Sequence, residues 1–303
     1  MRLRGAVPVA RGLRPSLDAL ARELPTDLVT TADILAYRRA AAPRDEPAAA
    51  VAARLGLRLE ERVTRGGDPL TILRGDRPPR ARVVFLHGGG LVAGSRQSGL
   101  DVVARHAADL SLEVLSLGYP LAPEARLDAM VRSVLRAVSD ARGEGTPVVL
   151  AGQSGGGGLA AAAMLACRDR GIPLAGHLLI HPMLGRGSGA SARQFADDPS
   201  WSARSTLTAW DAALDGTAEV TPAERRDLQG LPPTFLDVGS AELFRDDVVD
   251  FAGALWAAGG RAELHVWSGA FHASDCVDES AAASIAAHAA RRDWLARLLD
   301  GEV

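Results

Sequence analysis

A strand-like run, a glycine-flanked serine and a helix-like run follow one another directly near the middle of this chain. Residues 148–151 are apolar (VVLA), residues 152–156 read Gly-Gln-Ser-Gly-Gly, and residues 157–164 (GGLAAAAM) are rich in alanine. This layout is typical of a nucleophile elbow, a strained strand-to-helix turn that exposes a serine oxygen. Gly-x-Ser-x-Gly alone has a sizeable false-positive risk. The flanking strand and helix therefore carry the prediction that Ser154 is a nucleophile.

Composition bounds the classes of protein that this chain can belong to. With 303 residues, 47% of them hydrophobic, the chain can form one large α/β domain or two small ones around a sizeable core. A formal net charge of −3 gives no electrostatic reason to expect nucleic acid or an anionic membrane as a partner. The sequence contains no lysine, which excludes a lysine Schiff base and a phosphate-binding P-loop lysine.

The cysteines and the N-terminus point to a reducing compartment and an untethered protein. Cys167 and Cys276 lie far apart and form no disulfide framework or metal-ligand spacing, so we expect free thiols and no metal or cofactor. Residues 1–13 contain arginines but no apolar stretch of signal-peptide length. No run reaches the roughly 18 apolar residues of a membrane span. The expectation is a cytoplasmic protein without a membrane span, and a homodimer is compatible with it.

Strand-like and helix-like segments alternate from about residue 70 onward. The expected strands are residues 82–86, 113–117, 148–151, 177–180, 234–238 and 263–267, and the expected helices are 101–110, 127–141, 158–170, 248–258 and 280–299. Continuous apolar strands that alternate with helices predict an α/β fold whose mostly parallel sheet is covered by helices on both faces.

Two regions break this alternation and predict a helical cap. Residues 1–50 offer helices at 16–23 and 31–40 before any strand, and residues 185–231 hold one helical stretch, 206–214, among Gly-, Ser- and Pro-rich connections. The second region is far longer than an ordinary connection between a strand and a helix. We expect 1–50 and 185–231 to form a cap over the ligand-binding edge of the sheet. Residues 51–184 and 232–303 are then the two parts of the catalytic core.

Acyl transfer by serine also needs oxyanion donors and a base. Residues 87–90 (HGGG) follow the strand 82–86 and match a glycine-rich oxyanion loop, to which the N–H of Gly155 would add a donor. Among seven histidines, His272 alone lies in a loop after the last strand, in the serine-first, histidine-last order of this fold. The remaining histidines fall in the loop, on helices, within strands or before the insertion: His87, His106, His288, His177, His265 and His181.

The acid that orients the base should lie between residue 234 and His272. Asp237 lies within a strand and would point into a face of the sheet. Asp246 and Asp247 begin the next helix, where carboxylates commonly occur. Glu242 lies in the turn after the strand and can reach the base from the sheet edge. We predict Glu242 as the acid, with Asp246 as the alternative.

Several ordered motifs together resemble one known family. From about residue 80 to its end the chain resembles the hormone-sensitive-lipase-like branch of the α/β-hydrolase fold, the bacterial HGGG esterases. The motifs are HGGG at 87–90, YPLAPE at 119–124, GQSGGG at 152–157, PPT at 232–234, VGSAE at 238–242 with RD at 245–246, and GAFH at 269–272. The resemblance implies a catalytic set of Ser154, Glu242 and His272. It also implies oxyanion donors at Gly89, Gly90 and Gly155, with His87 and Gly88 supporting the loop.

The chain departs from the family pattern at four positions. Glu242 stands where the family usually has aspartate, and Ala273 replaces the glycine that commonly follows the histidine. Gln153 replaces an acidic residue before the nucleophile, and Pro120 replaces an arginine after the tyrosine. The last two changes together suggest that a charge pair beside the elbow has become a neutral arrangement.

The resulting prediction is a serine hydrolase that cleaves short- to medium-chain carboxylic esters through an acyl-enzyme. A small ester is the expected partner, and no cofactor is needed. The same catalytic set also serves acyl transfer, lactone chemistry and other biosynthetic reactions. A third hypothesis, a non-catalytic ligand-binding protein, is disfavoured because all three catalytic residues are present.

Overall fold

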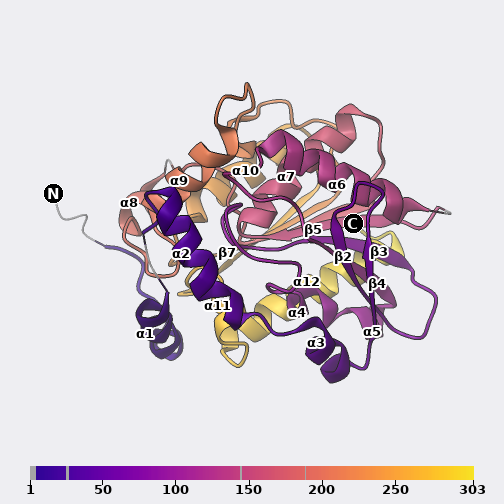
Figure 1. Ribbon diagram of the computed structural model, residues 1–303, viewed down its shortest axis with the longest axis horizontal. Coiled ribbons are helices and arrows are strands. Elements are labelled where there is room, and N and C mark those ends of the chain that lie inside the picture. The colour runs from indigo at the N-terminus through magenta and orange to yellow at the C-terminus, as the bar shows by residue number, and fades with distance from the viewer. Residues whose placement is uncertain (1–4, 25–26, 144, 188) are drawn as a thin grey trace.

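An eight-stranded sheet runs through the centre of the molecule (Figure 1). The computed structural model of the chain describes residues 5–24, 27–143, 145–187 and 189–303. Its strands lie in the order β1-β2-β4-β3-β5-β6-β7-β8, with β2 antiparallel to both β1 and β4 and all other pairs parallel. The strands are β1 Arg58–Val63, β2 Pro69–Arg74, β3 Ala81–Leu86, β4 Leu112–Leu117, β5 Val148–Gln153, β6 Gly176–Ile180, β7 Thr234–Gly239 and β8 Ala262–Trp267.

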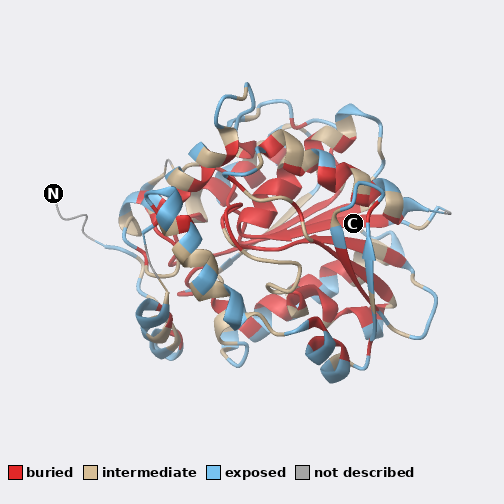
Figure 2. Cartoon of the chain, viewed as in Figure 1, coloured by how far each residue is buried: buried red, intermediate tan, exposed pale blue. Residues whose placement is uncertain are grey.

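Helices cover both faces of this sheet, which confirms the predicted fold class. One face carries α6 (Leu127–Arg142), α7 (Gly155–Asp169) and α10 (Arg245–Ala257), and the other carries α3 (Ala48–Leu55), α4 (Asp101–Ala104), α5 (Ala107–Leu110) and α12 (Ala282–Asp300) (Figure 1). The central strands are buried on both sides while the outer helix faces are exposed (Figure 2). Their unbroken apolar sequences follow from that double cover.

The structure differs from the sequence prediction at several elements, among them the helix α3, which was not predicted. The expected helix 101–110 is split into α4 and α5, because the N–H of His106 donates to the carbonyl three residues back (Val103, 3.2 Å) and tightens the turn. The strands β1 and β2 were not predicted, since β1 (RLEERV) is an exposed edge strand without an apolar run. Strand β5 also continues through Gln153, directly up to the serine.

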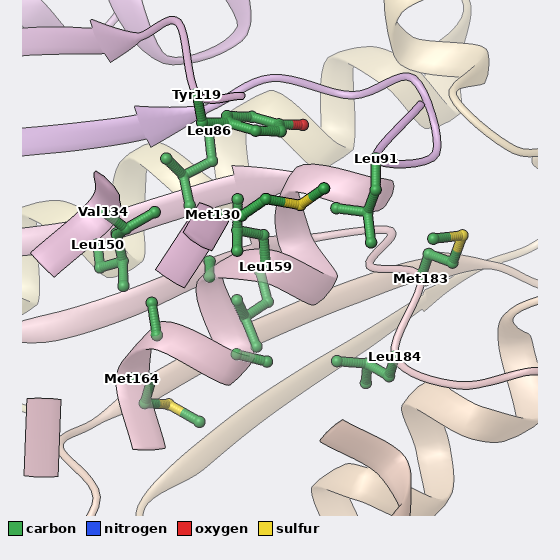
Figure 3. Close-up of a cluster of buried hydrophobic side chains, with 14 of the residues drawn as sticks. Leu86, Leu91, Tyr119, Met130, Val134, Leu150, Leu159, Met164, Met183 and Leu184 are labelled. Carbon is green, nitrogen blue, oxygen red and sulfur yellow. The ribbon is translucent and has the colours of Figure 1, made fainter. Parts of the chain in front are cut away.

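The larger core cluster lies between the sheet and α6 and α7 and reaches the loops that follow the strands. Figure 3 shows Leu86, Leu150 and Leu159 packed between strands and helix, with Leu91 and Met183 farther along toward the loops. Leu91 belongs to the loop after β3, and Met183 to the loop after β6. The same core therefore holds the loops at the carboxyl edge of the sheet.

The N-terminal helices pack against the segment that follows β6. The N–H of Leu28 donates to Ser205 Oγ (3.0 Å), Ser202 Oγ donates to Asp27 (2.7 Å), and the Tyr37 ring meets Trp201 edge-on at 5.8 Å. These contacts join α2 (Thr31–Ala41) and the residues just before it to α9 (Ala203–Leu214) and the residues just before that helix. The short helix α8 (Ala190–Gln194) precedes α9 in the chain. The helices α1 (Arg14–Glu23), α2, α8 and α9 gather on the left in Figure 1. No described helix combines the length and apolar character needed to cross a bilayer.

Candidate active site

The serine lies on a strained turn between β5 and α7. Ser154 has φ 53° and ψ −123°, a conformation that an L-residue rarely adopts. Its N–H donates to the carbonyl of Ile180 (3.0 Å), and its own carbonyl accepts from the N–H of Met183 (2.8 Å). The strand β6 and the loop after it thus hold the strained turn in place. The serine side chain points into a cleft and is 6% exposed.

Ser154, His272 and Glu242 form one continuous hydrogen-bonded chain. Ser154 Oγ lies 2.9 Å from His272 Nε2, and His272 Nδ1 lies 3.0 Å from Glu242 Oε1. The second carboxylate oxygen of Glu242 accepts from the N–H of Gly239 at 2.8 Å. With its proton on Nδ1, the imidazole donates to Glu242 and leaves Nε2 free to accept from the serine hydroxyl. This is the geometry that a nucleophile, its base and an orienting acid require.

The other carboxylates considered from the sequence lie elsewhere. Asp246 bonds Arg245 and the N–H of Ser191. Asp247 accepts from the N–H of Gly187. Asp237 points into a sheet face, as expected, and pairs there with Arg291 (2.7 Å to Nε).

The histidine is carried by the loop between β8 and α11 (Ser274–Val277). Phe244 packs edge-on against its ring at 4.9 Å, with the two ring planes 80° apart. Ala273, which follows, has φ 60°, a backbone region that favours glycine. The structure therefore gives a physical reason for the glycine that the family commonly has at this position.

The glycine loop after β3 approaches the start of α7 closely. A side chain at Gly155 would meet the backbone nitrogens of Leu91 (2.6 Å) and Gly90 (2.7 Å), so only glycine fits there. Gly89 and Gly90 have φ 109° and 63°, conformations that glycine adopts without strain. None of the hydrogen bonds among the described residues uses the N–H of Gly89, Gly90 or Gly155. These donors are therefore available beside the serine.

His87 stabilises this glycine loop through hydrogen bonds and ring stacking. Its Nδ1 lies 2.7 Å from the carbonyl of Gly88, its ring stacks on Tyr119 at 4.3 Å, and the Tyr119 hydroxyl donates to the His87 carbonyl at 2.8 Å. Burial lowers the pKa of His87 to about 4, although the bond to Gly88 acts in the opposite direction. The ring is therefore neutral at physiological pH and serves the loop as a hydrogen-bonded packing element.

The serine opens into a cleft of about 400 Å³. Leu20, Leu24 and Tyr37 of the N-terminal helices contribute apolar lining, and Gln153, Asp101 and Glu279 contribute polar lining. Trp201 also lines the cleft, and its ring lies 2.3 Å from the position that a Cβ on Gly90 would occupy. The tryptophan thus packs directly on the glycine loop.

A buried charged network behind the histidine was not found from the sequence. The Arg291 guanidinium of α12 pairs with Asp237 of β7 and with Asp275 of α11. His181, which follows β6, has its Nε2 3.4 Å from Asp275 Oδ1 and its ring edge-on to His272 at 4.9 Å. His181 follows a strand end, the one signal that could have singled it out. No local pattern announces Asp275 or Arg291, because packing alone brings them together.

The charges of this network shift the pKa values of His181 and Asp275. Burial alone would lower the pKa of His181, but the neighbouring Asp275 carboxylate outweighs burial and raises it. Burial likewise opposes the ionised form of Asp275, yet Arg291 and His181 hold its pKa well below the usual range. His181, Asp275 and Cys276 bring possible metal-ligand atoms within 4.8 Å of one another. Asp275 is already bonded to Arg291, so this group does not form a natural cation site.

A family model described as the α/β-hydrolase fold matches residues 83–275, more than half of the chain. The chain belongs to the α/β-hydrolase fold family. The matched region contains the glycine loop, the elbow and all three residues of the hydrogen-bonded chain.

Among the proteins similar in sequence to this chain are ester hydrolases of the same fold family. The acetyl-hydrolase of Streptomyces hygroscopicus is 32% identical over 228 residues, which cover 72% of this chain and 76% of that protein. The carboxylesterase NlhH of Mycobacterium tuberculosis is 34% identical over 232 residues, 69% of this chain and 72% of NlhH.

Solved esterase structures superpose on this chain over nearly its whole length. The esterase LipW of Mycobacterium marinum superposes with a TM-score of 0.84 at 28% identity, covering 97% of this chain and 98% of LipW. An esterase of the bacterial hormone-sensitive lipase family gives a TM-score of 0.81 at 26% identity, covering 96% and 99%. These similarities confirm the hormone-sensitive-lipase-like resemblance.

Proposed function

We propose that this α/β hydrolase is a carboxylic-ester hydrolase that works through an acyl-serine intermediate. The observation that carries the proposal is the chain Ser154–His272–Glu242, with distances of 2.9 Å and 3.0 Å, at the base of a cleft. The acetyl-hydrolase and carboxylesterases among its relatives support the same reaction. Short- to medium-chain acyl groups are the proposed substrates, in keeping with a cleft of about 400 Å³.

The geometry suggests the role of each residue. His272 Nε2 accepts the hydroxyl proton while Ser154 Oγ bonds to the ester carbonyl carbon. The negative charge that develops on the carbonyl oxygen is stabilised by the N–H groups of Gly89, Gly90 and Gly155. The carbon–oxygen bond to the alcohol then breaks, and His272 returns its proton to the leaving alcohol. Water, deprotonated by His272, then attacks the acyl carbon. The bond from that carbon to Ser154 Oγ breaks, His272 returns the proton to Ser154 Oγ, and the carboxylic acid is released. Glu242 holds the imidazole in the required tautomer throughout.

The Ser154→Ala variant tests the proposal. We expect it to lose at least about a thousandfold in kcat on p-nitrophenyl acetate while keeping the wild-type circular dichroism spectrum, because the nucleophile alone is missing. A fluorophosphonate should label the wild type and not the variant. Ser139→Ala is the control and should retain both labelling and turnover, because Ser139 lies in α6, bonds the carbonyl of Leu135 (2.8 Å) and does not line the cleft. A folded wild-type protein that resists labelling would contradict the proposal.

Acyl transfer uses the same first half-reaction and differs only in the second nucleophile. Product analysis with water and an added alcohol in competition separates the two outcomes. An excess of transfer product at low alcohol concentration would replace hydrolysis as the function.

We further propose that residues 1–50 and 185–231 form the cap over this cleft, and that the protein acts in the cytoplasm. The contacts of Leu28 and Tyr37 with Ser205 and Trp201 support the cap. Both cysteines are free, which is compatible with a reducing compartment. Cell fractionation with an antibody tests the location.

A further inference from the structure

The residue before the nucleophile occupies a distinctive position in the cleft. Gln153 ends β5, lines the cleft and is only 7% exposed. Its amide lies against Gly88 on one side and Gly99 on the other, where added Cβ atoms would stand 3.2 Å and 2.3 Å from Nε2. Glycine at both positions leaves the carboxamide its space beside the serine.

The oxygen of the Gln153 carboxamide has a hydrogen-bond partner in the described part of the protein, whereas its nitrogen has none. The thiol of Cys276 donates to Gln153 Oε1 at a sulfur–oxygen distance of 3.8 Å. The Cys276 thiol is free and exposed, and a cysteine thiol is protonated at neutral pH, so it acts as the donor. No hydrogen bond among the described residues uses Gln153 Nε2. The Gln153 amide nitrogen, which lines the cleft, therefore keeps two N–H donors for whatever occupies it.

These donors lie next to the reacting atom. The position of a Cβ on Gly88 is 3.2 Å from Gln153 Nε2 and 3.5 Å from Ser154 Cβ, so the amide and the nucleophile border the same space. Asp101 and Glu279 line the same cleft and both bond Arg105 at 2.8 Å. The cleft lining holds Asp45, Glu46, Asp101 and Glu279 against Arg44, so even with Arg105 bound to the last two carboxylates an excess of negative charge disfavours an anionic ligand group. A neutral oxygen is the acceptor that fits.

We propose that the Gln153 carboxamide is a specificity-determining donor that binds a neutral acceptor oxygen of the ester substrate, such as an ether, hydroxyl or second carbonyl oxygen close to the scissile bond. This inference rests on the proposed ester hydrolysis and names the class of ester that the site prefers. It also gives a function to a glutamine where the family usually has an acidic residue, because a carboxylate at this place would accept and not donate.

Matched ester pairs that differ by one oxygen test the inference. On the acyl side the pair is p-nitrophenyl methoxyacetate against p-nitrophenyl butanoate, and on the alcohol side 2-methoxyethyl acetate against butyl acetate. For each pair the ratio of kcat/KM is measured in the wild type, in Gln153→Met and in Gln153→Glu. Comparing ratios between enzymes cancels the intrinsic reactivity of each ester and any general loss of activity.

We expect Gln153→Met to reduce the preference for the oxygen-bearing ester by about three- to tenfold in one of the two pairs, the factor of one neutral hydrogen bond. Gln153→Glu should reduce it further, because two acceptors then face each other. The pair that responds reveals whether the oxygen belongs to the acyl group or to the alcohol. Gln97→Met is the matched control, because it removes a second carboxamide from the lining of the same cleft at a position that does not directly precede the nucleophile.

The outcomes separate this inference from the proposed function. If the wild type and all variants hydrolyse butanoate with unchanged ratios in both pairs, the inference is wrong and ester hydrolysis stands. If the preference falls in Gln97→Met and not in Gln153→Met, the donor is misassigned. If the wild type hydrolyses neither member of either pair, the proposed function itself fails. Should Gln153→Met not fold, Gln153→Glu carries the same comparison.

Discussion

At the scale of single residues, Glu242 stands where most of the family has an aspartate, and its longer side chain reaches the histidine. Its carboxylate spans from the turn after β7 to His272 Nδ1 (3.0 Å), and its other oxygen is anchored on the N–H of Gly239 (2.8 Å). That anchor fixes the extra rotatable bond, so the carboxylate keeps one orientation toward the imidazole.

This arrangement separates the two acids that the sequence left in competition. Glu242→Gln should lower kcat by about a hundredfold or more, because the amide no longer stabilises the imidazolium. Asp246→Asn should leave kcat within a fewfold of wild type, since Asp246 bonds Arg245 and Ser191 instead. Steady-state kinetics on p-nitrophenyl acetate decide, and the reverse order of effects would make Asp246 the acid.

His87 makes the glycine loop sensitive to acid. Its pKa falls from the usual 6.5 to about 4 on burial, so the folded protein favours the neutral ring. Its contribution to stability is complete above pH 6.5 and is lost as the pH falls toward 4, by about 3 kcal/mol in total. The free energy of unfolding of His87→Gln, measured in urea between pH 7 and pH 4, should fall less steeply than that of wild type. Parallel curves for the two proteins would contradict the assignment.

At the scale of elements, α12, α11 and β7 are joined by charges and not by apolar contacts alone. Arg291 is 1% exposed and bridges Asp237 and Asp275. His181, which Asp275 faces, touches the ring of His272. The closing helix is therefore linked to the histidine loop through a buried network.

Removing the cation from this network should lower the free energy of unfolding substantially. Arg291→Met leaves two buried carboxylates without their cation and should lower the free energy of unfolding by about 3–5 kcal/mol. The next residue supplies the control. Arg292 and its partner Asp109 have side chains 49% and 43% exposed, so Arg292→Met should cost roughly 0–1 kcal/mol. Urea denaturation of both variants measures the difference, and similar losses would show that the buried network is not what stabilises α12.

The sequence was sufficient to predict most helices and strands and the site residues in loops that follow strands. It said little about which side chains of different helices pack against one another. Chain order and strand ends suffice to predict where Ser154, Glu242 and His272 lie, and their side chains do meet in the structure. The Arg291–Asp275 bond depends on how α12 lies against α11, which no local pattern encodes. Strand β1 was missed for a related reason, because an exposed edge strand needs no apolar residues. The roles of the three site residues stay predictions until activity is measured.

At the scale of the whole molecule, stability is distributed unevenly between the core and the N-terminal helices. The central strands are fully buried between two large apolar clusters, whereas α1 buries only Leu20 and joins a small cluster with Phe271 (Figure 2). Since α1 and α2 supply one wall of the cleft, we expect the part of the molecule that opens most readily to border the cleft.

Hydrogen–deuterium exchange should reveal this gradient. Amides of α1 should exchange through local opening, orders of magnitude faster than those of β5, which exchange only with global unfolding. A fluorophosphonate adduct on Ser154 should slow exchange in α1 and α2 if these helices close over the bound group. Protection of α1 equal to that of β5 in the free protein would contradict a separately opening cap.

Because the two thiols differ in accessibility, labelling of one cysteine can report whether the cleft is occupied. Cys167 is sealed in α7 at 0% exposure, while Cys276 lines the cleft beside Gln153. A thiol-reactive dye added at mildly alkaline pH therefore reads one site only, and an occupied cleft shields that site from the dye. Ligands that are never turned over, including esters too slow for a colour assay, become measurable by how far they delay the labelling of a single sulfur atom.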